Sequence, residues 1–274
     1  MTGAVRPPIA HTTDLSGRDE AAFVHACALA AASGLRLVSL HGNGAPGDVE
    51  RLPVAERLLS RWNHARARAG RAALAVEHER RCAEGSEDVT ESLLEILDAL
   101  GPGLVVTGAQ ARHGLSAVLH ASVSEALARN LSVPTLVVPN QGRSFVNADT
   151  GAVELSRVLV PASDLTSAAI GLAAARTLAE RAGAGDVEYL MLHVGERALE
   201  GGATERGVRW LHQRGPLEAT ILETARAQGA CLIAMPSAGH DGLRDVLLGS
   251  HTEHVIREAG CPVLVVPTRP RGEG

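Results

Sequence analysis

The sequence predicts an α/β protein of two tandem domains, each a doubly wound, mostly parallel sheet of five strands with helices on both faces. Short apolar runs rich in valine and leucine alternate with longer helical stretches along all 274 residues. One order of elements occurs twice, and each copy closes with an apolar strand bracketed by prolines, at 134–139 and 262–267. The length is sufficient for two hydrophobic cores.

The first copy is expected to span residues 1–142. Its apolar runs predict strands and its longer stretches predict helices. In chain order these are a strand from about residue 8, a helix ending near 33, a strand at 35–41, a helix at 54–69, a possible strand at 72–77, a helix at 89–100, and strands at 104–107 and 134–139.

The second copy is expected to span residues 155–274. A short buried strand at 157–161 precedes a loop with a helix N-cap signal and an Ala-rich helix to about Ala182. Glycines at 229 and 260 end two later helices. The remaining elements are a strand at 187–194, a reduced third strand around 207–211, a helix at 216–228, a strand at 231–235, a helix from about Ser250 to Ala259, and a strand at 262–266.

A linker is predicted between the two copies, at residues 143–154. The segment is polar, carries glycine and shows no apolar period. The prolines that flank each closing strand confine any pairing of that strand to a short sheet edge, which limits open-ended association. A homodimer of the whole chain is a further expectation.

Composition excludes several function classes. The formal net charge is −5 and aromatic residues make up 2%, so neither phosphate-backbone neutralisation nor base stacking is favoured, and no nucleic-acid partner is expected. All 26 basic residues are arginines. A Walker A lysine, a Schiff base and a lysine general base are therefore excluded.

Cysteine spacing and the N-terminal sequence indicate a cytoplasmic protein. The four cysteines, at 27, 82, 231 and 261, have no C-x-x-C spacing and are expected to be reduced thiols. The N-terminus lacks a signal-peptide pattern, and no uncharged apolar run approaches about 18 residues. We expect no membrane association.

The most informative segment lies near the C-terminus. The strand at 231–235 enters a glycine-bearing loop that ends at Gly249-Ser250, where a helix is expected to begin and present free N–H groups to a phosphate. The segment resembles the nucleotide signature of the universal stress protein family: Gly, two residues, Gly, nine residues, then Gly followed by Ser or Thr. This copy keeps Gly239, Gly249 and Ser250, whereas Pro236 replaces the first glycine.

The resemblance covers nearly the whole chain. It implies that the two closing strands pair with each other inside the chain, and it implies an adenine-nucleotide site in the second domain. The implied cofactor is ATP, with or without Mg²⁺, and Asp164 would hold a ribose hydroxyl or a hydrated Mg²⁺. The other implied contacts are Pro161, Ala162, His193, Val194, Met235, Pro236 and His251. The bland alternative is that the glycines only permit a turn and that Ser250 caps a helix.

Weaker equivalents occur in the first domain, at Asp14, Gly108 and Ser122. His41 and His193 close equivalent strands of the two copies and are expected to be histidines hydrogen-bonded at a strand end. Ala111 and Ala121 replace the two later glycines, and each adds a methyl group where backbone would meet phosphate. This copy is expected to bind nucleotide weakly or not at all and to serve in packing and pairing.

The resemblance implies a stress-response sensor or adaptor with an unknown protein partner. No catalytic residue is assigned, and ATP hydrolysis, where it occurs, is expected to be slow. The histidines around the second glycine loop are expected to be surface residues, because no metal-ligand spacing accompanies them. A nucleotide-free interaction scaffold with relic glycine loops remains the alternative, and Pro236 favours it.

Overall fold

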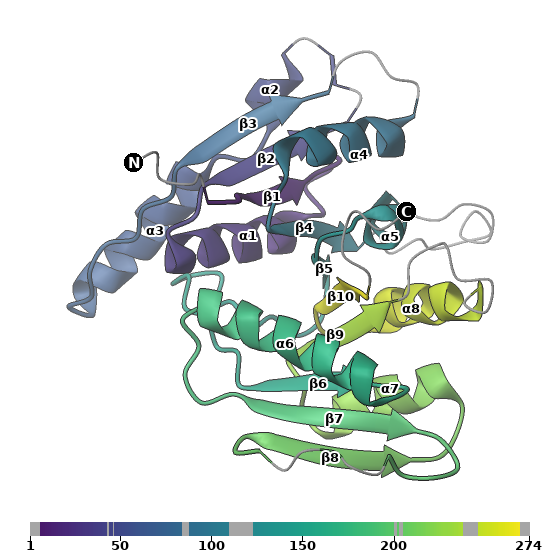
Figure 1. Cartoon of the computed structure of the whole chain (residues 1–274). Coiled ribbons are helices and arrows are strands. Elements are labelled where there is room, and N and C mark those ends of the chain that lie inside the picture. The colour runs from purple at the N-terminus through teal and green to yellow at the C-terminus, as the bar shows by residue number, and fades with distance from the viewer. Residues whose placement is uncertain are drawn as a thin grey trace, which may run out of the picture.

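The structure is a computed structural model that describes residues 6–42, 44–45, 47–83, 88–109, 123–199, 202, 205–237 and 246–268, with side chains from 251 onward in the last segment. Figure 1 shows two α/β halves joined by one continuous sheet. The predicted fold class, two tandem five-stranded doubly wound domains, is confirmed.

The first domain contains five strands and five helices within the described residues. Its elements are β1 (Ile9–Thr12), α1 (Glu20–Ser33), β2 (Leu37–His41), α2 (Asp48–Arg51), α3 (Ala55–Arg68), β3 (His78–Cys82), α4 (Val89–Leu100), β4 (Leu104–Ala109), α5 (Val123–Asn130) and β5 (Thr135–Pro139).

The second domain repeats this order with fewer helices among the described residues. Its elements are β6 (Arg157–Pro161), α6 (Leu165–Arg181), β7 (Glu188–Val194), β8 (Val208–Gln213), α7 (Leu217–Ala227), β9 (Leu232–Ser237), α8 (Val246–Glu258) and β10 (Val263–Pro267).

The sheet runs in the order β3-β2-β1-β4-β5-β10-β9-β6-β7-β8. Strands within each domain are parallel, and β5 and β10 pair antiparallel, with Leu136 opposite Leu264. The expected intrachain pairing of the closing strands is therefore confirmed. It leaves β3 and β8 as the two edges of the sheet.

Helices cover both faces of the sheet. Helices α1, α3 and α6 bury their apolar residues with one face in a core that runs across both domains. Helix α4 covers the other face in the first domain, and α7 and α8 cover it in the second. Because the strands are parallel, these layers place the carboxyl ends of β1, β2 and β4, and of β6, β7 and β9, at open rims.

The edge strand of the first domain differs from its prediction. It spans His78–Cys82 instead of 72–77, and it pairs in parallel with β2. The apolar side chains of Leu74 and Val76 pack on the core beneath α3, and the Asn63 amide bonds both backbone groups of Leu74. A charged sequence suits a sheet edge, which explains why the apolar pattern misplaced this strand.

Two elements of the second domain were also predicted wrongly. Strand β8 has six residues, all paired with β7, and is not reduced. Helix α8 begins at Val246, four residues before the predicted start at Ser250, because the apolar run 246–248 continues the helical pattern.

The segment predicted as a linker is packed against both domains. Phe145 is fully buried, its ring meets that of His25 edge-on, and a β-bridge joins Val146 to Val153. The indole Nε1–H of Trp62 donates to the carbonyl of Ala148 at 2.8 Å. The sequence shows no apolar period here because a few isolated side chains, not a regular element, make these contacts.

Candidate functional site

The second-domain candidate site lies where β6 and β9 separate. The two strands pair only at Val158–Leu232 and Leu159–Ile233, although β9 continues to Ser237. This gap is the topological switch point of the second half-sheet, the position where doubly wound folds bind ligands. The predicted residues Pro161, Ala162, His193, Val194, Met235 and Pro236 all lie at the carboxyl ends of the strands around it.

Asp164 is exposed at the entrance to this gap and caps α6. Its Oδ1 accepts the backbone N–H of Ser167 at 2.7 Å, and the Ser163 hydroxyl donates to Oδ2 at 3.0 Å. These bonds, the one from Ser167 first, lower the pKa of the carboxyl below its ordinary value. Asp164 is therefore an ionised, exposed carboxylate at the rim, and one of its oxygens caps the N-terminus of α6.

Asp14 is not the structural equivalent of Asp164, contrary to the sequence comparison. The backbone N–H of Thr13 donates to the carbonyl of Leu40 in β2, and that of Ala162 donates to the carbonyl of Leu192 in β7. Thr13 and Ala162 therefore hold equivalent positions, and the residue equivalent to Asp14 is Ser163. In the first domain a longer loop follows, and α1 begins only at Glu20. The Asp14 Oδ1 accepts the N–H of Ser16 at 2.8 Å within that loop.

His41 and His193 hold the equivalent positions that the sequence indicated. Each ring Nδ1 lies near a backbone carbonyl oxygen, that of Thr13 at 2.8 Å and that of Ala162 at 3.0 Å. A carbonyl only accepts, so Nδ1 carries the proton and Nε2 keeps a free lone pair.

Pro236 occupies the position of Gly108 in the first domain, as the sequence comparison placed it. An ideal Cβ on Gly171 of α6 would lie 2.8 Å from Pro236 Cγ, so the glycine makes room for the proline ring. Pro236 also lies beyond the last residue pair between β6 and β9, so its missing N–H removes no hydrogen bond between these two strands. The proline ring is therefore accommodated by its packing against Gly171.

The glycine loop of the second copy is only partly described. Gly239 and Ser122 lie outside the described residues, and Gly249 and Ser250, described as backbone, are the fourth and fifth residues of α8. His251 contacts α7, with its Nδ1 2.5 Å from Glu218 Oε1. Whether these residues contact a ligand stays a prediction.

The first domain holds a cavity of about 310 Å³ at the carboxyl ends of β1, β2 and β4. Its wall includes two predicted residues, Asp14 and Gly108, and many that the sequence analysis missed. His41, whose strand-end position the sequence indicated, also lines the cavity. The missed residues are Thr12, Thr13, Arg18, Asp19, Gly42, Val89, Leu93, Thr107, Ala109, Val123, Ser124 and Asn140.

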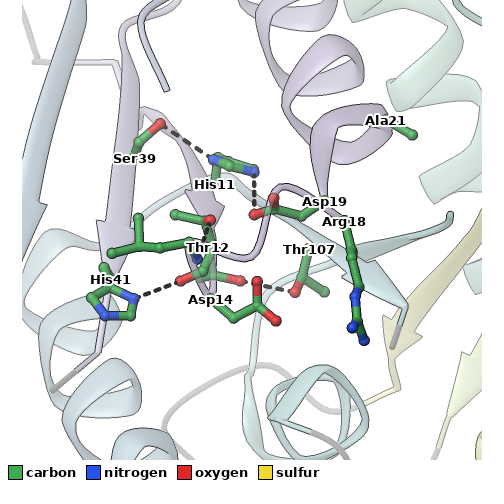
Figure 2. Close-up of polar contacts among 12 residues, drawn as sticks. His11, Thr12, Asp14, Arg18, Asp19, Ala21, Ser39, His41 and Thr107 are labelled. Atoms are coloured by element: carbon green, nitrogen blue, oxygen red, sulfur yellow. Dashed lines mark hydrogen bonds and ion pairs between the residues drawn. The ribbon is translucent and has the colours of Figure 1, made fainter. Parts of the chain in front are cut away.

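A buried polar chain leads from the sheet edge to this cavity, as Figure 2 shows in part. The N–H of Ala55 donates to His78 Nδ1 at 3.3 Å, which leaves the proton on Nε2. His78 Nε2 then donates to the Ser39 hydroxyl at 2.9 Å, and that hydroxyl donates to His11 Nδ1 at 3.3 Å. His11 therefore carries its proton on Nε2, directed at Asp19 on the cavity wall.

The His11–Asp19 pair is incomplete. His11 Nε2 and Asp19 Oδ2 lie 3.9 Å apart, and neither buried atom has a hydrogen-bond partner. Burial lowers the pKa of His11 to about 3 and raises that of Asp19. The available sequence signal was two polar residues, His11 and Ser39, at inward positions of otherwise apolar strands.

The described part of the chain shows no metal site, no membrane-spanning helix and no disulfide. Among these residues no group of three or more His, Cys, Asp or Glu side chains could hold a metal ion. No helix there has the length and apolar character needed to cross a bilayer. The four cysteines are free thiols.

The fold defines a tandem protein of doubly wound α/β domains, with a cavity at the carboxyl ends of the first-domain strands. The chain belongs to the universal stress protein family, whose model matches residues 8–139 and 145–267. The two matches correspond to the two domains.

Curated relatives match short segments. Universal stress protein MJ0531 of Methanocaldococcus jannaschii is 52% identical over 46 residues, which cover 17% of this chain and 27% of the relative. Universal stress protein YxiE of Bacillus subtilis is 36% identical over 66 residues, or 23% of this chain and 45% of the relative. The chain thus matches less than half of the length of either.

Solved structures match the complete tandem. A universal stress protein from Archaeoglobus fulgidus covers 95% of this chain, with 98% of its own length, at 19% identity and a TM-score of 0.60. One from Pseudomonas aeruginosa covers 96%, with 94% of its own length, at 17% identity and a TM-score of 0.62. At these identities the likeness establishes the fold.

Proposed function

We propose that this universal stress protein binds an adenine nucleotide, ATP with or without Mg²⁺, in its second domain and acts as a stress-response sensor or adaptor. The observation that carries the proposal is the separation of β6 from β9 at the switch point, with Asp164 and His193 at its rim. The signature residues Gly239, Gly249 and Ser250 follow β9 directly in sequence and would close the site on its phosphate side.

The chemistry proposed for this site is binding, with at most slow hydrolysis. His193 would offer the lone pair of Nε2 to an adenine amino group or a ribose hydroxyl, and Asp164 would meet a ribose hydroxyl or a hydrated cation. Arg257 is engaged elsewhere, 3.4 Å from Glu125, and does not serve as an arginine finger in this arrangement. Free cysteines agree with a reducing compartment, and we place the protein in the cytoplasm.

The test is mass spectrometry of small molecules released on denaturing the purified chain, combined with calorimetric titration of Mg-ATP. We expect about one nucleotide per chain. Gly249→Val should abolish ATP binding because a branched side chain would fill phosphate space. Ala121→Val, which places a valine at the equivalent position of the first copy, should leave ATP binding intact. Unaltered ATP binding by Gly249→Val would show that the assigned site is wrong.

The alternative function is a nucleotide-free scaffold for other proteins. The packing of Pro236 against Gly171 favours it, because that packing gives the replaced signature glycine a structural role. Absence of released nucleotide, together with absence of heat on Mg-ATP titration, would support the scaffold.

A further inference from the structure

We infer that a groove in the first domain is the docking site of the chain's own C-terminal tail, residues 269–274. The groove lies between the C-terminal ends of α4 and α5, at the opposite end of the strands from the cavity described above. The inference rests on an equivalent groove in the second domain, to which another segment of the chain is bound. It does not depend on nucleotide binding.

The two grooves hold the same place in the repeated fold. Their volumes are similar, about 600 Å³ in the first domain and about 550 Å³ in the second. Leu94 and Glu95 of α4 line the first groove, and Leu222 and Glu223 of α7 line the second. Each groove also includes the residues that join the last helix of its domain to the closing strand.

In the second domain, the segment that follows β5 reaches the groove. Arg143, four residues beyond the end of β5 at Pro139, donates its backbone N–H to the Gly260 carbonyl at 2.8 Å. Its side chain lines the groove and lies close to Gly229, where an ideal Cβ would be 3.2 Å from Arg143 Nη1. The segment after the closing strand of the first domain is thus bound to the second domain.

The pairing of the closing strands directs the tail to the first-domain groove. Leu136 and Leu264 are each the second residue of their strand, and they lie opposite each other in the antiparallel pair. A local two-fold axis at this pair relates the two copies, so the segment after β10 approaches the first domain as the segment after β5 approaches the second. Arg271, four residues beyond Pro267 at the end of β10, is therefore the equivalent of Arg143.

The charges of the two grooves differ as this docking requires. The second groove is balanced by two glutamates and two arginines, which are Glu223, Glu258, Arg143 and Arg226. Among the described residues, the wall of the first groove holds two carboxylates, Glu95 and Asp98, and no cation. The tail reads Arg-Pro-Arg-Gly-Glu-Gly and brings two guanidinium groups, whose geometry suits carboxylates.

The tail should bind through its arginine side chains more than through its backbone. Pro270 stands where the first copy has Gly142, whose φ of +125° a proline cannot adopt. The backbone path of the segment after β5 is therefore not repeated. Leu94, Leu131 and Val133 provide apolar wall for the methylene groups of the arginines, while the carboxylates meet the charged ends.

The experiment is limited trypsin digestion of the full chain, followed by intact mass spectrometry. Trypsin cleaves after Arg271 and releases the last three residues, whereas Pro270 blocks cleavage after Arg269. A docked Arg271 side chain is withheld from the protease, so we expect slow release from the wild-type chain. Glu95→Gln combined with Asp98→Asn should accelerate this release about tenfold, because the tail loses both charged partners.

The matched control changes the second groove. Glu223→Gln combined with Glu258→Gln should leave the release of the last three residues unchanged. Equal release from the wild-type chain and from the variant without Glu95 and Asp98 would overturn the inference. Protection that increases with protein concentration would also overturn it, because the tail would then occupy the groove of a second copy.

A charge swap tests the same contact without a protease. Asp98→Arg and Arg271→Glu should each lower the urea midpoint of unfolding, because each places like charges together in the groove. The two changes combined should restore the wild-type midpoint, because opposite charges then face each other again. Losses that simply add in the double variant would show that the tail does not dock at Asp98.

Discussion

Individual histidines in the core of the first domain are neutral because of burial. The pKa is lowered to about 3 for His11 and to about 4 for His25, and desolvation is the main cause for both. His25 Nδ1 lies 2.7 Å from the carbonyl oxygen of Ala21, so it donates its proton to an acceptor within α1. Protonating either ring in the folded state would place a charge in an apolar core.

This burial predicts that stability falls as the pH is lowered from 7 to 5. The unfolded chain binds a proton at each histidine near pH 6.5, whereas the folded chain does so only near pH 3 to 4. Because the unfolded state binds more protons in that window, the free energy of unfolding rises with pH there. Each histidine should contribute roughly 2 kcal/mol between pH 7 and pH 5.

Urea unfolding at the two pH values measures this effect. His25→Gln should reduce the pH-dependent difference by about 2 kcal/mol relative to wild type, and His64→Gln, at an exposed position, should leave it unchanged. The raised pKa of Asp19 acts in the opposite direction but is common to all three proteins. Equal pH dependence of wild type and His25→Gln would contradict the prediction.

At the level of elements, α5 and α8 connect the two copies through reciprocal ion pairs. Each helix carries a glutamate and an arginine four residues later, Glu125 with Arg129 and Glu253 with Arg257. Arg257 Nη2 lies 3.4 Å from Glu125 Oε1, and Arg129 pairs with Glu253. Both helices follow a glycine-loop segment, so the pairs join the elements next to the two candidate sites.

We predict that Arg257→Ala lowers the free energy of unfolding by about 1–2 kcal/mol, measured by urea titration. The effect should exceed that of an ordinary surface pair because the Glu125 side chain is 7% exposed and loses a charged partner. Arg214→Ala is the control: Arg214 and Glu196 are 3.8 Å apart and 68% and 89% exposed, so the change should stay within about 0.5 kcal/mol. Similar effects of both substitutions would show that the Arg257–Glu125 pair stabilises the fold no more than an exposed surface pair does.

The sequence predicted which elements exist better than where their ends lie. Periodicity located α4 at its observed bounds and β5 to within one residue, because the apolar residues of each element determine it locally. It failed for β3, where an exposed edge requires charge, and for the start of α8. The repeated glutamate–arginine spacing was visible, but its meaning depended on the antiparallel β5–β10 pairing that brings the two helices together.

The candidate sites were predictable only in part for a related reason. The sequence indicated that His41 and His193 are equivalent, because each follows a leucine at the end of the second strand of its copy. Asp19 could not be found, because a loop whose length differs between the copies brings it to the cavity wall. Residues that act through a nonlocal contact, such as His11 through Ser39, leave only a weak signal in one sequence.

On the scale of the whole molecule, the two domains share a sheet and a core. The β5–β10 pairing closes the sheet internally, and one apolar cluster includes residues of α1, α3, α6 and the segment around Phe145. Interfaces between domains are usually smaller and more polar than a shared core, and domains joined by them separate more easily. Because this shared core and the continuous sheet join the two halves, the chain should unfold as one cooperative unit.

The two tryptophans report this directly, because Trp62 lies buried in α3 of the first domain and Trp210 lies in β8 of the second. Trp210→Phe leaves a probe of the first domain, and Trp62→Phe leaves a probe of the second. Within each variant, we expect the fluorescence transition in urea to coincide with the circular dichroism transition, which reports both domains. A fluorescence midpoint displaced from the dichroism midpoint in either variant would mean that the domains unfold separately, and that the continuous sheet joins two independent cores.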